Sequence, residues 1–413
     1  MLLSGYSITI LRIITRLNIG GPAIQAISLS EELSSGEFKS VLIAGQVGSN
    51  EEDMSYLASE KGIEPILIKE LGREISFFDD IKAILSLRSL IIKFKPDIVH
   101  THTAKAGALG RLATISVNLF CRKRKKIRIV HTFHGHVFHS YFNKYKTWIF
   151  ILVEKFLGRF TDRIIVISTS QKEDICYRFG IVDEKKTKII PLGFNLSIFK
   201  KDEEERINIR KKFLKEIELD SFVVGIVGRL TGVKNHSLLL QALYILKNQK
   251  RIGKLICMIV GDGELKEDLK SEVAELGLDE LVVFTGWQKD MAIIYKAFDA
   301  VILTSKNEGT PVAIIEAMAS GIPAAATDVG GVRDLFGKIE EKTEQGFSIG
   351  ENGILMESDN LEAVAGAVLY LINEKEMVES MARKAQNYVR KNYSFERLSD
   401  DIKSLYRELT YNK

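Results

Sequence analysis

Short apolar runs alternate with longer helical segments along all 413 residues of the chain. Runs such as 8–14 (ITILRII) and 222–228 (FVVGIVG) lack regular polar alternation, which is typical of strands covered on both faces. Segments such as 79–94 (DDIKAILSLRSLIIKF) and 236–248 (HSLLLQALYILKN) space their apolar residues as a helix does. Strands separated by helices predict parallel sheets, so the expected fold class is α/β with doubly wound domains.

The same alternation of strand-like and helical segments occurs in both halves of the chain, and a chain of this length predicts two domains. The segment 196–213 (LSIFKKDEEERINIRKKF) carries many charges of both signs and follows the strand-like segment that ends in PLGFN. We therefore place the boundary there and predict domains over 1–195 and 196–390. Doubly wound sheets bind ligands beyond the carboxyl ends of their strands, so we expect the site in a cleft between the two sheets.

The composition narrows the class of protein. The three cysteines lie far apart, which excludes a disulfide framework and a paired-cysteine zinc motif and fits a reducing compartment. Glu154 and Lys155 interrupt the apolar stretch 148–160 well short of the ~18 residues that a membrane span needs. The first residues, MLLSGYSITILRII, predict a strand rather than a signal peptide. We therefore expect a cytoplasmic protein.

The net charge of +4 is unevenly distributed. Residues 1–195 carry 28 Lys and Arg against 19 Asp and Glu, whereas residues 196–413 carry 30 against 35. The first half therefore predicts an anionic partner, such as a phospholipid surface or a lipid-linked phosphate. Its densest basic run is 122–128 (RKRKKIR), for which a solvated loop is an equally good interpretation. The acidic second half and the absence of aromatic residues beside this run argue against nucleic acid.

The segment 305–331 (SKNEGTPVAIIEAMASGIPAAATDVGG) contains the most informative pattern. Thr310 and Pro311 suit the N-cap and first turn of a helix, which places Glu308 at the helix mouth and Glu316 inside an apolar helix. A carboxylate in such a place needs a partner, which ribose or sugar hydroxyls would supply. Free amides at the helix start would bind oxygens as well. The alternative is a helix-start carboxylate and a glutamate satisfied within the protein.

Two turns between a strand and a helix have the composition of phosphate sites. After the strand at 222–228, Arg229 and Lys234 precede a helix, and two cations beside a helix N-terminus predict a diphosphate site. Two surface cations near a turn are the alternative. After the first strand, the adjacent Gly20 and Gly21 allow a phosphate to approach the backbone closely, although many such turns contain paired glycines.

Five of the seven histidines lie in two strand-like segments: His100, His102, His131, His134 and His136. No Cys, Asp or Glu supplies the spacing of a zinc site, and no His-Glu-x-x-His occurs, so we predict no metal. We expect histidines at strand ends facing a cleft to form hydrogen bonds with a sugar or to assist proton transfer. For any single one of them a structural role is the alternative. There is also no Walker A sequence, and GDGELK at 261–266 lacks the third glycine of a dinucleotide fingerprint.

Taken together, these segments resemble the family 4 glycosyltransferases, which are retaining enzymes of the GT-B fold. The resemblance spans nearly the whole chain and includes the early Gly-Gly turn, TFH at 132–134, PLGFN at 191–195, GRLTGVKN at 228–235, GDGEL at 261–265, FTGW at 284–287 and the Glu-x7-Glu segment. VHTHTAKAGALGRLA at 99–113 is similar to bacterial members that build surface polysaccharides. The resemblance implies two Rossmann-like domains that face a cleft, with a C-terminal helix in 391–413 that crosses back onto the first domain.

The resemblance also implies roles for the matching residues. Arg229 and Lys234 would hold the diphosphate, and Glu316 would hold the ribose hydroxyls. Glu308 would contact the donor sugar, and His134 would face that sugar near its anomeric carbon. The remaining donor-binding positions would act through their backbone: Gly20 and Gly21 in the first domain, and Gly309, Thr310, Pro311 and Val312 in the second.

The implied reaction transfers a sugar with retention of its anomeric configuration, without a metal ion or a cofactor. The donor is a nucleoside diphosphate sugar, most commonly linked to UDP in this family. No Asp-x-Asp, the usual metal motif of the other large glycosyltransferase fold, occurs in the chain. The expected acceptor is a polyprenyl-diphosphate-linked saccharide at the inner face of the plasma membrane. The first domain would contact anionic lipid peripherally through 122–128, Lys144, Lys146 and Trp148. The alternative is a nucleotide-sugar 2-epimerase of the same fold, which would convert the donor without an acceptor.

Overall fold

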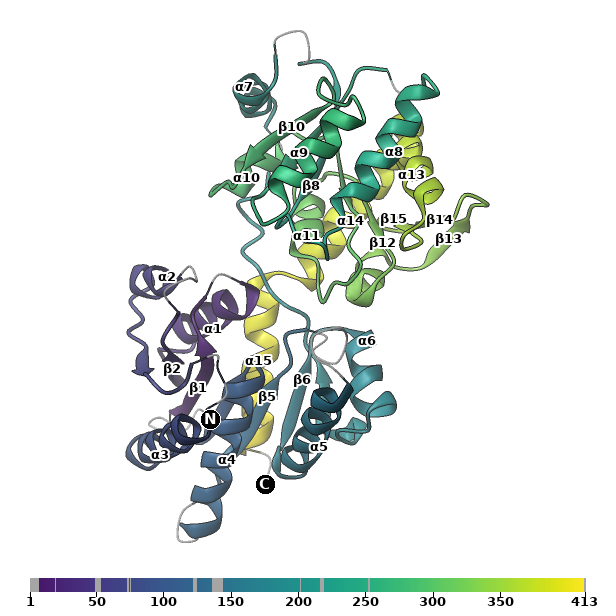
Figure 1. The fold of residues 1–413 in the computed structure, drawn as a ribbon. Coiled ribbons are helices and arrows are strands. Elements are labelled where there is room, and N and C mark those ends of the chain that lie inside the picture. Colours follow the sequence, from purple (N-terminus) through teal and green to yellow (C-terminus); the bar gives the residue numbers. More distant parts are fainter. Residues whose placement is uncertain are drawn as a thin grey trace. The chain divides into compact units, whose positions relative to one another are not determined.

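The structure is a computed structural model that describes residues 7–18, 20–48, 53–72, 74, 76–121, 125–135, 144–200, 202–215, 219–251 and 253–411, with the backbone alone for 144–146. The chain divides into two compact units (Figure 1). Unit 1 comprises residues 1–193 and 396–413, and unit 2 comprises residues 194–395. Each unit contains its own sheet, covered by helices.

Unit 1 is built on a parallel sheet with the strand order β3-β2-β1-β4-β5-β6-β7. Its strands are β1 (Ile8–Arg16), β2 (Phe38–Gly45), β3 (Ile66–Ile68), β4 (Ile98–His102), β5 (Arg128–Thr132), β6 (Arg163–Val166) and β7 (Thr187–Ile189). Its helices are α1 (Gly21–Glu32), α2 (Ser55–Glu60), α3 (Phe77–Phe94), α4 (Ala104–Phe120), α5 (Lys144–Phe160), α6 (Thr169–Lys172) and α15 (Phe395–Tyr411). The strand order reverses between β1 and β4, and doubly wound sheets bind ligands at such a switch point.

Unit 2 is built on a sheet with the order β10-β9-β8-β11-β12-β15-β14-β13. Its strands are β8 (Phe222–Val227), β9 (Leu255–Val260), β10 (Val282–Gly286), β11 (Ala300–Leu303), β12 (Ala324–Thr327), β13 (Ile339–Lys342), β14 (Phe347–Gly350) and β15 (Ile354–Met356). Its helices are α7 (Glu203–Phe213), α8 (His236–Asn248), α9 (Lys266–Glu275), α10 (Met291–Tyr295), α11 (Val312–Ala319), α12 (Arg333–Phe336), α13 (Leu361–Asn373) and α14 (Lys375–Asn392). Strand β14 pairs antiparallel with β13 and β15, whereas the other pairs are parallel. Here the order reverses between β8 and β11.

Small residues let the helix α4 lie close to the sheet of unit 1. A Cβ on Gly107 would lie 2.5 Å from the His131 ring, and one on Gly110 would lie 2.7 Å from the Thr101 methyl group. The apolar side of α4 packs with strands β1 and β4 in one buried cluster. The polar residues at the ends of β4 and β5 are thereby buried beside a rigid layer.

The segment 196–213, expected as the boundary between domains, belongs to unit 2 in the structure. Its helix α7 is held there because Arg206 and Arg210 each place a nitrogen 2.6 Å from a carboxylate oxygen of Asp299. The change of unit occurs at 193/194 and again at 395/396, instead of at 195/196 and 390/391. Helix α15 is part of unit 1, where Arg397 donates to the carbonyl groups of Pro191 and Leu192. Among the described helices, none combines the length and apolarity that crossing a bilayer requires.

Candidate active site

The loops that follow β8 and β11 are joined by hydrogen bonds at the switch point of unit 2. The hydroxyl of Thr304 lies 3.2 Å from the carbonyl oxygen of Lys234 and 2.9 Å from that of Asn235. The backbone N–H of Lys306 donates to the carbonyl of Val233 at 2.8 Å. These neighbouring strands end at the same edge of the sheet, so the residues that follow them share one site.

Lys234 and Glu308, which come from these two loops, form an ion pair. Lys234 Nζ lies 2.5 Å from Glu308 Oε1, and Ser305 Oγ donates to the same oxygen at 2.7 Å. The side chain of Glu308 is 11% exposed and that of Lys234 is 25% exposed. The structure therefore brings together the predicted diphosphate-binding cation and the predicted sugar-binding carboxylate.

The backbone at Glu308 is fixed by the glycine pair that follows β12. Gly330 has φ of +53°, and a Cβ there would lie 1.9 Å from the carbonyl oxygen of Glu308, so only glycine fits. The N–H of Gly331 donates to the same carbonyl at 3.2 Å. Three loops at the carboxyl edge of the sheet therefore position the Glu308 carboxylate.

Glu316 lies in helix α11, where its carboxyl group is partly buried among apolar residues. Burial raises the pKa of Glu316 to about 7, although its hydrogen bond with the Tyr295 hydroxyl acts in the opposite direction. The same hydroxyl group lies 3.0 Å from the carbonyl oxygen of Ala313. A carboxyl group with such a raised pKa gains free energy from a ligand that donates hydrogen bonds to its ionised form.

In unit 1 the predicted residues lie after β1 and β5. Gly20 precedes helix α1, and a Cβ on Gly21 would meet no atom of the described residues within 4 Å, so no neighbour among them requires glycine there. His134 follows β5 and lies in a cluster of buried polar side chains with His102 and Arg12. The predicted residues Gly20, Gly21 and His134 thus lie at the carboxyl edge of the sheet, where β1, β4 and β5 end.

Two family models match the chain, one in each half. Residues 19–198 match the model described as Glycosyltransferase Family 4, and residues 207–388 match the model described as Glycosyl transferases group 1. A UDP-Gal:alpha-D-GlcNAc-diphosphoundecaprenol alpha-1,3-galactosyltransferase from Escherichia coli is 32% identical over 398 residues, which are 94% of this chain and 95% of that protein.

The chain belongs to the family 4 glycosyltransferases. It is therefore an enzyme, a glycosyltransferase. The capsular polysaccharide biosynthesis glycosyltransferase CapM from Staphylococcus aureus is 26% identical and covers 81% of this chain, with 83% of its own length matched.

Solved structures show that the glycosyltransferase has the GT-B fold, as expected. HepE from Anabaena in complex with UDP superposes with a TM-score of 0.77 at 20% identity, over 96% of this chain and 99% of that chain. A glycosyltransferase from Rickettsia africae also gives a TM-score of 0.77 at 20% identity, over 98% of this chain and 100% of that chain.

Arg229 of the glycosyltransferase is exposed just beyond β8. In the described part of the chain, its guanidinium has no hydrogen bond to a side chain and no ion pair. A guanidinium cannot lose its charge at neutral pH and offers five donors. Arg229 therefore presents an uncompensated cation at the same edge of the sheet as Lys234.

The start of helix α11 differs from the sequence-based expectation. The helix begins at Val312, with Pro311 as its N-cap and no capping by a side chain, so Thr310 does not cap it. The proline side chain has no hydrogen-bond acceptor, so the first helical N–H groups have no partner from the side chain of the cap. Gly321, with φ of +71°, follows the C-cap residue Ser320, where the left-handed backbone favours glycine.

Of the basic run 122–128, the structure describes residues 125–128. The described residues Lys125 and Lys126 pair with Asp97 and Asp162 at 3.2 Å and 3.4 Å. Because they precede β5, they lie at the amino edge of the sheet, whereas α5 begins after its carboxyl edge. The side chains of Lys144 and Lys146, residues 122–124 and His136 lie outside the described part.

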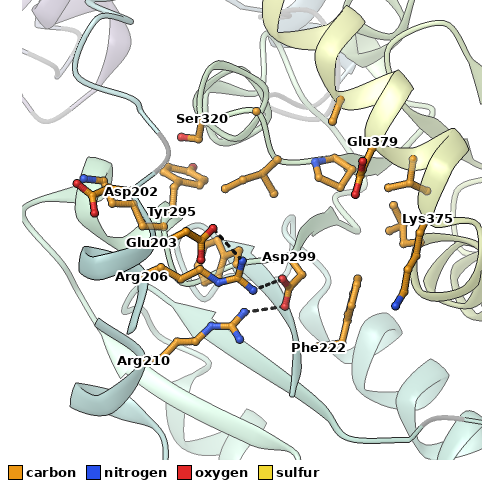
Figure 2. A pocket seen from close by; sticks show the side chains of 18 of the residues that line it. Asp202, Glu203, Arg206, Arg210, Phe222, Tyr295, Asp299, Ser320, Lys375 and Glu379 are labelled. Atoms are coloured by element: carbon orange, nitrogen blue, oxygen red, sulfur yellow. Dashed lines mark hydrogen bonds and ion pairs between the residues drawn. The ribbon is translucent and has the colours of Figure 1, made fainter. Parts of the chain in front are cut away.

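A cavity of about 1170 Å³ in unit 2 lies apart from all predicted site residues (Figure 2). It is at the amino edge of the sheet, because its lining residues Phe222, Asp299 and Pro323 directly precede or begin β8, β11 and β12. Figure 2 shows Arg206 and Arg210 pointing toward Asp299, with Glu203 as a second carboxylate partner of Arg206, so the two guanidinium charges are paired within the protein. The cavity therefore has a structural ion-pair cluster in its wall, at the other edge of the sheet from the loops that carry Lys234 and Glu308, although Tyr295, the partner of Glu316, also lines it.

Sequence reasoning missed several members of the site. Ser305 was not distinguished from other loop serines, and Tyr295 gave no signal because its contact with Glu316 is tertiary. Arg12 had a signal that was not used, since a single arginine interrupts the apolar strand ITILRII. Among the described residues, no group of three His, Cys, Asp or Glu side chains has an arrangement suited to a metal ion.

Proposed function

We propose that the enzyme transfers a sugar from a UDP-sugar to a polyprenyl-diphosphate-linked saccharide, with retention of configuration and without a metal ion. The observation that carries this proposal is the exposed Arg229, which has no ion pair among the described residues, in the same loop as Lys234 of the Lys234–Glu308 pair at the switch point of unit 2. Two cations at one strand end, of which Arg229 is exposed and Lys234 is partly exposed, suit a diphosphate. The relative from Escherichia coli, whose name specifies a UDP-Gal donor and a diphosphoundecaprenol acceptor, supports this class of substrates.

The proposed role of Arg229 and Lys234 is to stabilise the charge that develops on the departing diphosphate. As the bond from the anomeric carbon to the diphosphate oxygen breaks, positive charge spreads over the sugar ring and negative charge over the phosphates. The acceptor hydroxyl attacks from the face that the diphosphate leaves, and the diphosphate takes the hydroxyl proton. This path retains the configuration and uses no protein nucleophile.

Glu308 is suited to bind the sugar rather than to form a bond with it. Its Oε1 already accepts from Lys234 and Ser305, whereas Oε2 has no hydrogen bond in the described part of the chain. An ionised carboxylate held in this way accepts from a sugar hydroxyl through its second oxygen. The backbone amides of Gly309, Thr310, Pro311 and Val312 are assigned to the same sugar, except that proline offers no N–H group.

The reaction is tested with the full chain, UDP-galactose and a synthetic GlcNAc-diphosphopolyprenol, in the presence of EDTA. We expect UDP release that depends on the acceptor, and an α-linked product from the α-linked donor when its anomeric proton is examined by NMR. The same assay with UDP-glucose and UDP-N-acetylhexosamines, and then with GDP- and ADP-sugars, identifies the donor that the enzyme uses. Conversion of the donor to its 2-epimer without acceptor would support the epimerase instead.

Glu316 predicts a pH dependence of UDP binding. Because only the ionised carboxyl accepts from both ribose hydroxyls, and because its pKa in the free enzyme is about 7, protonation competes with UDP below that pH. The dissociation constant should therefore increase by about tenfold per unit as the pH falls from about 7. Above pH 7 the affinity should stay level.

The matched variant is Glu316→Gln, which keeps the shape of the side chain but does not titrate. The diphosphate of UDP titrates itself, and that effect is common to both proteins. Isothermal titration from pH 5 to 8 should show weaker binding to the variant at pH 8 and a smaller slope below pH 7. Equal slopes in both proteins would exclude Glu316 as the ribose ligand.

We also propose that α5 brings unit 1 to an anionic membrane at the inner face of the plasma membrane. Its exposed face carries Trp148, Ile149, Leu152, Val153, Phe156 and Phe160 at helical spacing. Lys155 and Arg159 are exposed on the same helix, and its only acidic residue, Glu154, is buried. An apolar stripe flanked by cations alone is complementary to an anionic lipid surface.

The double substitution of Leu152 and Phe156 by glutamate should weaken binding to vesicles of phosphatidylglycerol and phosphatidylcholine by about tenfold or more. It removes apolar area from the lipid-facing side of α5 and adds negative charge that anionic lipid repels. Flotation of the full chain measures this change. Met377→Glu, an equally exposed apolar residue of unit 2, serves as the control and should float as the natural chain does. Unchanged flotation of the α5 variant would refute the assignment.

A further inference from the structure

A buried arginine in unit 1 contacts a chain of histidines that ends at His134. Arg12 lies on β1 and is fully buried, and in the described part of the chain no carboxylate pairs with it. Its NH1 nitrogen lies 3.1 Å from His102 Nε2, and His102 Nδ1 lies 2.8 Å from His134 Nε2. Because β1 and β4 are parallel neighbours in register, Arg12, His100 and His102 share one face of the sheet.

The direction of each hydrogen bond in this chain is determined by Arg12. A guanidinium only donates, so His102 Nε2 must accept and carries no proton. The single proton of neutral His102 is then on Nδ1, from which it is donated to His134 Nε2. His134 Nε2 is thereby an acceptor, and neutral His134 carries its own proton on Nδ1.

The assignment requires that both imidazoles be neutral, and the surroundings make them so. Burial, followed by the charge of Arg12, lowers the pKa of His134 to about 3. Burial, the neighbouring imidazoles and Arg12 lower the pKa of His102 well below its ordinary value. At neutral pH each ring therefore carries one proton, and one arrangement of donors satisfies both contacts.

A second branch of the cluster satisfies Arg12 without changing this result. Arg12 NH2 donates to the Tyr406 hydroxyl at 3.2 Å, and that hydroxyl group lies 2.6 Å from His100 Nδ1. His100 Nε2 then donates to Thr132 Oγ1 at 2.7 Å. Tyr406 belongs to α15, so the last helix of the chain anchors the arginine.

The chain of donors ends at an atom without a partner. His134 Nδ1 is buried and has no hydrogen bond in the described part of the chain. An orphan N–H group of this kind lowers stability unless a ligand accepts its hydrogen bond. Its position two residues beyond β5, at the carboxyl edge of the sheet, is where doubly wound units bind ligands.

We propose that Arg12 is a positioning residue that acts through His102 to fix His134 with its proton on Nδ1, so that this N–H donates to a hydroxyl oxygen of the donor sugar. The tautomer assignment stands on unit 1 alone, whereas the sugar as acceptor rests on the proposed function. In this arrangement Nδ1 of His134 has no lone pair for a proton. His134 therefore orients the sugar and does not remove the acceptor's proton through this atom.

The tautomer is tested by long-range ¹H–¹⁵N NMR of the full chain labelled with ¹⁵N-histidine, at pH 7 and without ligand. The His134 signals are assigned by their loss in His134→Gln. We expect a protonated-type shift for Nδ1 and an unprotonated-type shift for Nε2 in the natural chain. The reverse pattern would overturn the proposal, whether or not the enzyme turns over any sugar.

Variants of Arg12 test the cause. Arg12→Met removes the donor and should give a mixture of His134 tautomers and a kcat about tenfold lower, with KM nearly unchanged. Arg12→Lys keeps a donor and charge and should restore both readouts to within about threefold. Tyr406→Phe, which removes the hydroxyl group that contacts Arg12 and His100 but leaves the Arg12–His102 contact, should leave the His134 tautomer unchanged. A natural tautomer in a folded Arg12→Met would overturn the proposal.

Replacements of His134 link the tautomer to turnover. Asparagine places an amide donor close to the position of Nδ1, whereas glutamine reaches the position of Nε2. His134→Asn should therefore keep about tenfold more activity than His134→Gln. Equal activity of the two variants, with the expected NMR pattern, would refute the donation to the sugar while the role of Arg12 stands.

Discussion

Glu154→Ala should lower the free energy of unfolding of unit 1 by about 3–5 kcal/mol, because it leaves a buried guanidinium without its counter-charge. Glu154 on α5 and Arg111 on α4 are both fully buried, and Arg111 NH2 lies 2.7 Å and 2.9 Å from the two carboxylate oxygens. Arg111 Nε donates to the carbonyl of Gly107 at 2.7 Å, and its NH1 already has no hydrogen-bond partner among the described residues. No rearrangement of the exposed surface replaces the lost carboxylate.

Hydrogen exchange measured by mass spectrometry on the full chain separates this effect from unit 2. Peptides from α4 and α5 should lose protection by about 10²- to 10⁴-fold, while peptides from α8 and α13 should exchange as in the natural chain. Glu184→Ala, which breaks an exposed ion pair with Lys172, is the matched control and should leave α4 and α5 protected. The double replacement of Arg111 by Met and Glu154 by Leu should recover most of the stability, because it removes both charges together. Unchanged exchange in Glu154→Ala would show that the pair contributes nothing.

This ion pair also shows what the sequence did not reveal. The same Glu154 was interpreted as a break in an apolar stretch, since its partner Arg111 lies 43 positions earlier in the chain. The alternation of runs predicted which segments become helices and strands, because covered strands and amphipathic helices have distinct periods. The alternation of these runs does not indicate which buried charged residues on two different helices contact each other.

The candidate site was more accessible to prediction in unit 2 than in unit 1. Lys234 and Glu308 were identified separately, and their pairing follows from topology, because both come directly after strands that adjoin the switch point. In unit 1 the network depends on Tyr406, which is 394 positions from Arg12 and reaches it only after α15 has packed. The β13–β14 hairpin was also missed, since IEEK lacks the apolar character that marked the other strands.

Arg229→Ala and Lys234→Ala should each lower kcat by about 10²-fold or more, by analogy with the loss of other groups that stabilise developing charge. The effect on KM should be smaller, because the charge on the diphosphate increases as its bond to the sugar breaks. The two variants are expected to differ in whether the substitution also breaks an ion pair. Among the residues that the structure describes, Arg229 has no ion pair to lose, whereas removal of Lys234 also leaves Glu308 with Ser305 as its remaining side-chain donor. Lys234→Ala should therefore weaken sugar binding in addition to slowing the reaction.

Steady-state kinetics with UDP-galactose and the lipid-linked acceptor measure both effects. Lys306→Ala is the matched control, because it removes an exposed cation from the loop that carries Glu308, where its side chain lies 3.7 Å from Asp359. It should keep kcat within about twofold of the natural chain, since one exposed ion pair contributes little. Arg229→Lys retains the charge without the bidentate geometry and should fall between the natural enzyme and Arg229→Ala. Near-normal turnover in both alanine variants would mean that the diphosphate leaves from another place, and the assignment of this edge of unit 2 to the donor would then be wrong.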